Sequence, residues 1–340
     1  AGPYKFDSFK NNTTVLVLND KNKGNFEGKT ATIPKIVIRL VESNVVIAAL
    51  EKGEVDISAG EIEKTNIDKA TEAKLQLHNY PRNGYGMIVY KANKGPTAIK
   101  EVRQALGYLV NRNEFVEKIV GGFGSAVNGP YGLSQWFYKE NKDVLETELN
   151  NYVLNVAKAN ELLDTTEYKF ESDGVTPFDA EKATGGDYFR YNAKKEQLVV
   201  KHFASEKNPV TDLIISSIVP TAKEAGVNYY IEQGEFSTLS SYMQGREEND
   251  FNAFNLATSF TSVYDPYTGH HSDFVGLGSN WSDIADPQLD AAIEALRAKD
   301  PTDRAGYSAA VVEYLKIWND LLPSLPLYSN LYHDIATTRV

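Results

Sequence analysis

The sequence predicts a two-lobed α/β protein, and three observations carry that prediction. At 340 residues and 37.8 kDa, the chain is long enough to bury two separate hydrophobic cores. Short alternating or continuous apolar runs, typical of strands, recur between segments with helical spacing. One strand, helix, strand unit, at residues 196–233, has the length and the turn residues of a parallel βαβ module.

Composition narrows the class of protein. Apolar residues make up 42% of the chain and charged residues 24%, which is ordinary for a folded globular protein. The 35 basic and 46 acidic side chains leave a net charge of −11, which opposes binding to nucleic acid or to an anionic membrane. The absence of cysteine excludes disulfides, thiolate metal sites and a cysteine nucleophile. No apolar run approaches the ~18 residues that a membrane span needs.

The first part of the chain predicts strands around one helix. Apolar runs at 13–19 and 33–41 predict two strands, separated by the polar loop 20–30. Residues 46–53 then show an apolar helical face that ends at a glycine, and a short strand is expected at 55–57. These segments together predict one strand and helix module.

A further strand and a helix hairpin follow. Residues 85–93 predict a strand, and the Lys-Gly-Pro sequence at 94–96 ends it, so we expect the chain to cross between lobes here. Thr97 is the expected N-cap of the first helix of the hairpin, and Asn113 that of the second. The glycine pair at 121–122 is expected to adopt the left-handed conformation that ends the second helix.

The second half of the chain predicts a polar surface and then regular elements. Residues 138–186 are polar and show helical spacing only at 155–164. In the βαβ module, Pro220 is expected to kink the helix because it removes one backbone donor. The remaining expected elements are a helix at 236–243, a second crossing strand at 249–260, and amphipathic helices at 286–298 and 304–321.

Three motif-like stretches fall short of a catalytic or metal site. Residues 24–30 resemble a phosphate loop, but three residues rather than four separate the glycines and no helix follows, so we expect a hairpin loop. Residues 20–25 begin like a calcium loop, but a glycine stands at the fifth position, which indicates a solvated turn. For the pair His270 and His271, a structural or solvent-facing role is favoured over a metal site. A hydrolase built on two carboxylates stays open, because nothing in the sequence selects a pair.

Five segments in order resemble one family. They are GPYKFDSF at 2–9, the stretch 35–58 with its GEVD sequence, the helix hairpin 101–130, the stretch 224–256, and the late helices with the PLY sequence at 286–330. Together they resemble the extracytoplasmic solute-binding proteins of the peptide and nickel class, which supply ABC importers. The region 140–190 resembles nothing specific.

The resemblance implies a type II periplasmic-binding-protein-like fold of the peptide-binding class. It divides the chain into a remainder of the first lobe at 1–88, a second lobe at 89–254, and a hinge return with helices at 255–340. Family members have a longer N-terminal part with a secretion signal and a lipid-carrying cysteine. We therefore expect an internal or C-terminal fragment with an incomplete first lobe. The hinge is expected near 86–89 and 253–257, on crossing strands that lie side by side.

The resemblance also implies where ligand binds. In peptide-binding members, the loop corresponding to 258–266 has an aspartate four residues before its proline, and this carboxylate pairs with the amine of the peptide. Here that position is Ser262, and Asp265 is expected to cap a turn before the proline. The candidate ligand-binding residues come from this loop and from the loop after the helix hairpin: Phe260, Ser262, Tyr264, Asp265, Asn128, Gly129 and Tyr131.

The expected function is the capture of oligopeptide for an ABC importer by hinge closure, without catalysis, cofactor or metal site. The expected partners are a peptide or small solute and the permease subunits in the membrane, and the protein is expected to be a monomer. The expected location is the extracellular face of the membrane or the periplasm, with a lipid anchor in the full-length protein. The alternatives are a nickel, haem or sugar cargo, and a surface adhesion or chaperone-like protein that has lost transport.

Overall fold

The computed structural model describes residues 2–261, 263–300 and 302–340. By their internal contacts, these residues form two compact units. The first unit comprises residues up to 61, 65–77 and 334–340, and the second comprises 62–64 and 78–333. None of the helices in the described ranges is long and apolar enough to cross a membrane.

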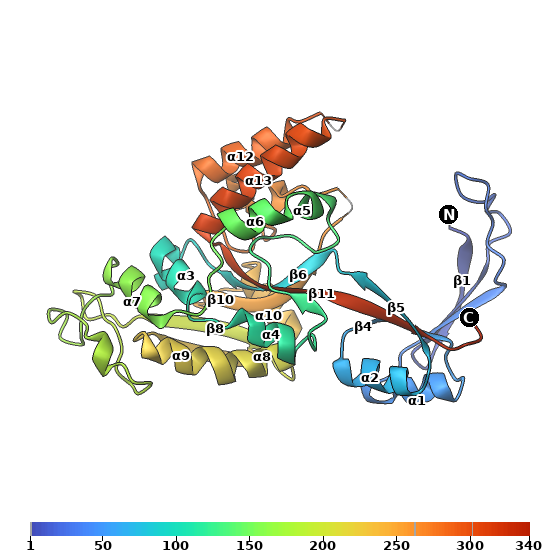
Figure 1. Cartoon of the computed structure of the whole chain (residues 1–340), viewed down its shortest axis with the longest axis horizontal. Helices are drawn as coiled ribbons and strands as arrows, with labels where there is room; N and C mark the ends of the chain where they lie inside the picture. Colours follow the sequence, from blue (N-terminus) through green and yellow to red (C-terminus); the bar gives the residue numbers. More distant parts are fainter. Residues whose placement is uncertain (1, 262, 301) are drawn as a thin grey trace. The chain divides into compact units, whose positions relative to one another are not determined.

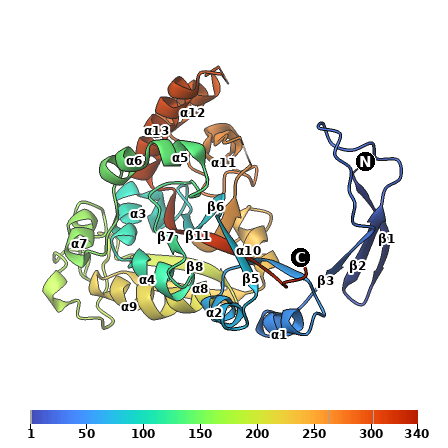
Figure 2. The ribbon, with the colours of Figure 1, turned by 45° about the vertical axis from the view of Figure 1, so that its right-hand side comes forward.

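The first unit contains a small antiparallel sheet and two helices (Figures 1 and 2). Strand β2 pairs with both β1 and β3, and the β2–β3 pairing confirms that the glycine-rich loop is a hairpin loop. A separate small core is formed by Val46, Ile47, Leu50, Ala70 and Ile335. The elements are β1 (Tyr4–Lys10), β2 (Thr13–Leu18), β3 (Lys35–Arg39), η1 (Ser43–Val45), α1 (Val46–Glu51), β4 (Ile57–Glu61) and α2 (Lys64–Glu72).

The second unit is built on a sheet with the strand order β11-β6-β10-β8-β9. Strand β8 is parallel to both β9 and β10, as expected for the βαβ module, whereas β6 is antiparallel to β10 and β11. The strands of this sheet are β6 (Gly84–Tyr90), β8 (Val199–Ser205), β9 (Asn228–Gly234), β10 (Ala253–Ser259) and β11 (Ser324–Ala336). Strand β11 also pairs with β4, β5 (Gln76–Pro81) and β7 (Gly124–Ser125).

Helices cover both faces of this sheet (Figure 1). One face carries α3 (Lys100–Gly107), α4 (Arg112–Lys118), α7 (Val156–Asp164), α8 (Pro209–Leu213), η4 (Ile214–Ile218) and α9 (Val219–Glu224). The other face carries α5 (Trp136–Glu140), α6 (Lys142–Glu148), α10 (Phe236–Met243), α12 (Pro287–Arg297) and α13 (Arg304–Leu321). The short elements η2 (Pro96–Ala98), η3 (Ala180–Lys182), α11 (Tyr267–His270) and η5 (Ser272–Phe274) lie in the connections.

Strand β6 supplies both hydrophobic cores. Successive side chains of a strand point to opposite faces of a sheet. Tyr85, Met87 and Val89 accordingly lie in the core under α12 and α13, whereas Ile88 and Tyr90 lie in the core under α8 and α9. The continuous apolar sequence of β6 is therefore the sequence of a strand that is covered on both faces.

The division by contacts differs from the predicted limits at 88 and 254. Strands β6 and β10 pair over seven residues, from Ala253 opposite Tyr90 to Ser259 opposite Gly84, so both lie inside the second unit. The expectation that the two crossing strands lie side by side is confirmed. The segments expected to form the hinge, 86–89 and 253–257, pair with each other inside the second unit, and the position of the hinge stays a prediction.

The helix hairpin forms, but both predicted caps are wrong. Helix α4 begins at Arg112 after Asn111, so Asn113 lies inside the helix. Thr97 lies in η2, two residues before Ile99, the N-cap of α3, and its hydroxyl donates to the carbonyls of Lys91 and Asn252. The hydroxyl predicted to cap a helix thus bonds instead to backbone carbonyls beside the ends of β6 and β10. The glycines at 121 and 122 do have positive φ angles of 58° and 83°.

The helix that contains Pro220 is interrupted as expected. Its first part, α8, passes into the π-helical turn η4, and α9 begins one residue before Pro220. Proline cannot donate to the carbonyl one turn earlier, and a π-turn is one way a helix accommodates that loss. The polar stretch 138–186 also contains more structure than expected, because α6 buries Leu145 in the core.

A buried ion pair holds the end of β6. Lys91 follows the last residue of the strand, and its ammonium donates to the carbonyl of Met243 and to the carboxylate of Asp283, both at 2.7 Å. The side chains of Lys91 and Asp283 are 4% and 12% exposed. This contact joins the strand to α10 and to the loop before α12.

Substitution Lys91→Met is expected to lower the free energy of unfolding of the second unit by about 3–5 kcal/mol, because it leaves a buried carboxylate unpaired. All three tryptophans lie in this unit, so tryptophan fluorescence during urea unfolding measures its stability. The matched control is Lys158→Met, which removes an exposed ion pair with Glu161 and is expected to change little. Equal effects of the two substitutions would contradict this role.

Candidate functional site

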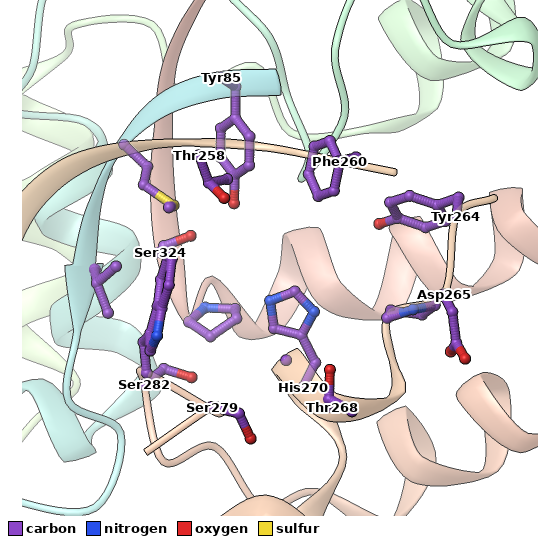
Figure 3. Close-up of a pocket in the computed structure, with 16 residues that line it drawn as sticks. Tyr85, Thr258, Phe260, Tyr264, Asp265, Thr268, His270, Ser279, Ser282 and Ser324 are labelled. Atoms are coloured by element: carbon purple, nitrogen blue, oxygen red, sulfur yellow. The ribbon is translucent and has the colours of Figure 1, made fainter. Parts of the chain in front are cut away.

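A cavity of about 220 Å³ lies where β6 and β10 meet the loop before α11 (Figure 3). The lining residues lie in the second unit and are mostly aromatic, small or hydroxyl-bearing. They are Tyr85, Met87, Val89, Thr258, Phe260, Tyr264, Asp265, Pro266, Thr268, Gly269, His270, Ser279, Trp281, Ser282, Pro323 and Ser324. Apolar walls with a few polar groups are typical of ligand pockets.

Strand pairing builds the aromatic wall. Thr258 of β10 lies opposite Tyr85 of β6, and Phe260 follows just after the end of β10. The rings of Tyr85 and Phe260 stack with centroids 5.7 Å apart and planes 7° apart. Tyr264 meets Phe260 edge-on at 5.4 Å, so three rings form one continuous apolar surface.

The close approach of the two strands depends on Gly84. A Cβ atom at this position would lie 2.0 Å from the carbonyl oxygen of Thr258, which no side chain can tolerate. Glycine therefore permits the pairing that places Tyr85 and Phe260 against each other.

His270 places a neutral imidazole in the cavity. Figure 3 shows its ring between Ser324 and Tyr264, with Thr268 close by. Its Nδ1 atom is hydrogen-bonded to the hydroxyl of Tyr314 at 2.8 Å, and its ring meets that of Trp318 edge-on. Burial lowers the pKa of His270 to about 4, so the imidazole is uncharged at neutral pH.

Asp265 lies at the edge of the cavity and its charge is already balanced (Figure 3). One carboxylate oxygen accepts a hydrogen bond from the backbone N–H of Tyr267 at 3.0 Å, and the other lies 3.2 Å from Arg297. The Arg297 guanidinium in turn lies over the ring of Tyr267, 4.0 Å from its centroid. The turn cap expected for Asp265 is therefore present, and the cavity offers no unpaired carboxylate among its lining residues.

The seven predicted site residues have three different outcomes. Phe260, Tyr264 and Asp265 line the cavity together, whereas Ser262 lies outside the described residues. The three residues from the loop after the helix hairpin, Asn128, Gly129 and Tyr131, do not line it.

The loop after the helix hairpin supports the cavity from the interior. Tyr131 is 1% exposed, and its hydroxyl accepts from the backbone N–H of Asn128 at 3.2 Å. The side chain of Asn128 bridges Arg112 and Asn151. The neighbouring carbonyl of Pro130 accepts from the hydroxyl of Tyr264 at 3.0 Å. This loop therefore positions a residue of the aromatic wall.

Sequence reasoning missed the residues that β6 and the later loops contribute. Tyr85, Met87 and Val89 share one face of a strand, and that alternation was available as a signal once the strand was predicted. Trp281 and Ser324 carried no such signal, because only the tertiary fold brings the loop before α12 and the start of β11 to this cavity.

The two adjacent histidines have different surroundings. His271 is buried, and its Nδ1 atom accepts from the backbone N–H of Asp273 at 3.1 Å. Its Nε2 atom lies 3.5 Å from a carboxylate oxygen of Glu294. No set of three or more His, Asp or Glu side chains with the geometry of a metal site occurs within the described ranges.

The described residues thus form an α/β fold in which a sheet covered on both faces carries an aromatic cavity at the end of its paired strands. The family model described as bacterial extracellular solute-binding proteins, family 5 Middle, matches residues 1–280. The chain belongs to this family, and the predicted fold class is confirmed.

Curated relatives match the chain over different extents. The oligopeptide-binding protein AppA of Bacillus subtilis is 24% identical over 335 residues, which cover 98% of this chain and 56% of that protein. The heme-binding protein A of Haemophilus influenzae is 25% identical over 176 residues, 51% of this chain and 30% of that protein.

Solved structures share the fold. The structure of Bacillus subtilis AppA with a nonapeptide has a TM-score of 0.77 at 19% identity, and covers 99% of this chain and 62% of that one. Lactococcal OppA with an endogenous peptide has a TM-score of 0.78 at 17% identity, covering 99% of this chain and 61% of that one. The chain thus spans about three fifths of the length of these relatives.

Acid is expected to destabilise the second unit partly through His270. The unfolded histidine binds a proton with a pKa near 6.5, whereas the folded one does so only near 4, so stability falls as the pH drops from about 6.5 to 4. Between pH 7 and 4.5 the loss due to His270 is about 2–3 kcal/mol. In the His270→Gln variant, urea unfolding followed by tryptophan fluorescence should show that much less pH dependence. An unchanged slope would show that the folded imidazole titrates normally.

Proposed function

We propose that this chain is the substrate-binding component of an ABC-type peptide importer and that it captures oligopeptide without catalysing a reaction. The observation that carries the proposal is the aromatic cavity, whose lining residues offer stacking surfaces, hydroxyl groups and a neutral imidazole, and whose single carboxylate is paired. Such a surface accepts apolar and aromatic side chains of varied sequence. Membership of the solute-binding family and the peptide-binding names of the relatives support it.

The cavity, at about 220 Å³, is large enough for one side chain of a longer ligand. The rest of an extended peptide is held by main-chain hydrogen bonds, which impose little sequence preference.

The proposed mechanism is closure of two lobes on the ligand. A ligand shifts such an equilibrium only through contacts that are better in the closed state. We place the chain at the extracellular face of a bacterial membrane, as a monomer that delivers its cargo to permease subunits. Peptide is favoured over haem or nickel cargo because the described residues supply an apolar side-chain pocket and no group of metal ligands.

Peptide cargo is expected to co-purify with the protein as a ladder of masses in native mass spectrometry. After the cargo is removed by unfolding and refolding, calorimetric titration with the recovered peptides should give binding without turnover products. Recovery of a single non-peptide solute, or of hydrolysed products, would contradict the proposal.

Substitution Phe260→Ala is expected to weaken peptide binding about tenfold or more, because it removes the ring that stacks on Tyr85 in the cavity wall. The matched control is Phe236→Ala, which truncates an exposed phenylalanine at the start of α10 and should leave the affinity unchanged. Titration calorimetry measures both variants. Equal affinities of the wild type and Phe260→Ala would remove the cavity from the proposed ligand surface.

A further inference from the structure

A polar cavity of about 350 Å³ lies in the second unit, beyond the last residue of β6. The end of α10, the loop that follows it and the loop before α12 supply the rest of its lining. Among the described residues, none lines both this cavity and the aromatic cavity. Apart from one glycine, its lining side chains are polar, and they include Lys91 and Lys94. Two amines in one cavity make it a candidate site for amine chemistry.

The first amine is engaged in the fold. Lys91 donates to the carbonyl of Met243 and to the carboxylate of Asp283, both at 2.7 Å. Its side chain is only 4% exposed. An amine held in a buried ion pair is not available to react, so Lys91 acts in this cavity as a fixed positive charge.

The second amine is held by two hydrogen bonds and keeps a third position free. The Nζ atom of Lys94 donates to the backbone carbonyl of Asn249 at 2.9 Å and to the side-chain Oδ1 atom of the same residue at 3.1 Å. A lysine ammonium has three N–H donors, and no third acceptor for this one occurs among the described residues. A neutral amine can therefore keep both hydrogen bonds and place its lone pair in the third position. Lys94 is partly exposed and lines the cavity, so a small electrophile bound there can reach the nitrogen.

The charges around Lys94 support a reactive amine. Burial lowers the pKa of Lys94, and the positive charge of Lys91 lowers it further. The carboxylates of Asp250 and Asp283 act in the opposite direction. Each of these carboxylates is already paired, Asp250 with Lys201 and Asp283 with Lys91. A desolvated lysine beside a second cation is one of the ways in which proteins make an amine nucleophilic.

The rest of the lining indicates the kind of electrophile. Glu247 and Glu248 can accept hydrogen bonds, whereas Asn93 and Tyr242 can both donate and accept them. No aliphatic side chain lines this cavity in the part of the chain that the structure describes. The volume is several times the ~30 Å³ that one water molecule occupies in the liquid. A small molecule with several hydroxyl groups matches such a lining.

We propose that Lys94 is a modification site, at which a small hydroxylated aldehyde condenses with the side-chain amine. The ammonium first releases one proton to solvent. The nitrogen lone pair then attacks the carbonyl carbon and a C–N bond forms, and loss of one water molecule leaves an imine. The products are the imine, one water molecule and one proton, and no oxidant or reductant is consumed. This site is independent of the proposed capture of peptide.

Reductive trapping makes the modification measurable. The 340-residue chain is incubated at pH 7 with limiting glyceraldehyde and sodium cyanoborohydride, which reduces the imine to a stable secondary amine. Peptide mass spectrometry gives the labelling rate of each lysine. Lys94 is expected to react at least about threefold faster than Lys299, an exposed lysine after α12, since a pKa lowered by one unit gives about ten times more neutral amine. Lys158, whose pKa is raised by its hydrogen bond to Glu161, should react more slowly than both.

An exposed charge tests the electrostatic part of the argument. Asp250→Asn removes a carboxylate that favours the charged form of Lys94, so labelling of Lys94 should become about twofold faster or more. The matched control is Asp187→Asn, which removes an aspartate paired with Lys223 and should leave the labelling of Lys94 unchanged. The two aspartate side chains are 70% and 78% exposed, so neither substitution is expected to disturb folding.

The opposite effect is expected for Lys91→Met, which removes the positive charge beside Lys94. Labelling of Lys94 should then fall to the rate of Lys299 or below. Because this substitution also weakens the fold, tryptophan fluorescence first establishes that the variant is folded. If it is not, Asp250→Asn alone decides the matter.

Three results would overturn the site. In the first, Lys94 of the wild type is labelled no faster than Lys299. In the second, Asp250→Asn and Asp187→Asn give the same labelling rate for Lys94. In the third, propanal, which has no hydroxyl group, selects Lys94 over Lys299 as strongly as glyceraldehyde does, which would exclude recognition of a hydroxylated aldehyde by the cavity.

Discussion

The antiparallel pairing of β6 with β10 is the constraint on which the second unit depends. Seven residue pairs align the two strands, and Gly84 permits their close approach at the end where the aromatic cavity lies. Because strand side chains alternate, this one pairing commits Tyr85, Met87 and Val89 to one face of the sheet. The central sheet, its two cores and the aromatic wall therefore all depend on the pairing of β6 with β10.

The cavity at the end of these strands is neutral because its one carboxylate is paired with a guanidinium and its imidazole is uncharged. Asp265 faces Arg297, and burial keeps the imidazole of His270 uncharged. Tyr264 lines the aromatic cavity, and its hydroxyl donates to the carbonyl of Pro130. The loop after the helix hairpin, distant in sequence, thus positions one ring of the cavity wall.

Hydrophobic periodicity was a sound guide to the regular elements, because burial of one face repeats along a strand or helix whatever it packs against. The helices at α10, α12 and α13 and the parallel βαβ module follow the predicted positions. Capping was a poor guide. The hydroxyl of Thr97 donates to carbonyls at two strand ends, and the N-cap of α3 is Ile99, because tertiary contacts rather than the local sequence decide where this side chain lies. Of the candidate site, the loop after β10 was found, while the contribution of β6 needed the register.

The sequence by itself determined the α/β class, the order of strands and helices, and the family through its ordered motifs, since these depend on local periodicity and residue identity. Only the tertiary structure decided which apolar residues line a cavity rather than a core. It also decided where the contacts divide the chain, and that the carboxylate of Asp265 is paired with Arg297. The physical reason is that a hydrogen-bond acceptor is free or paired according to neighbours distant in sequence, which no local pattern encodes.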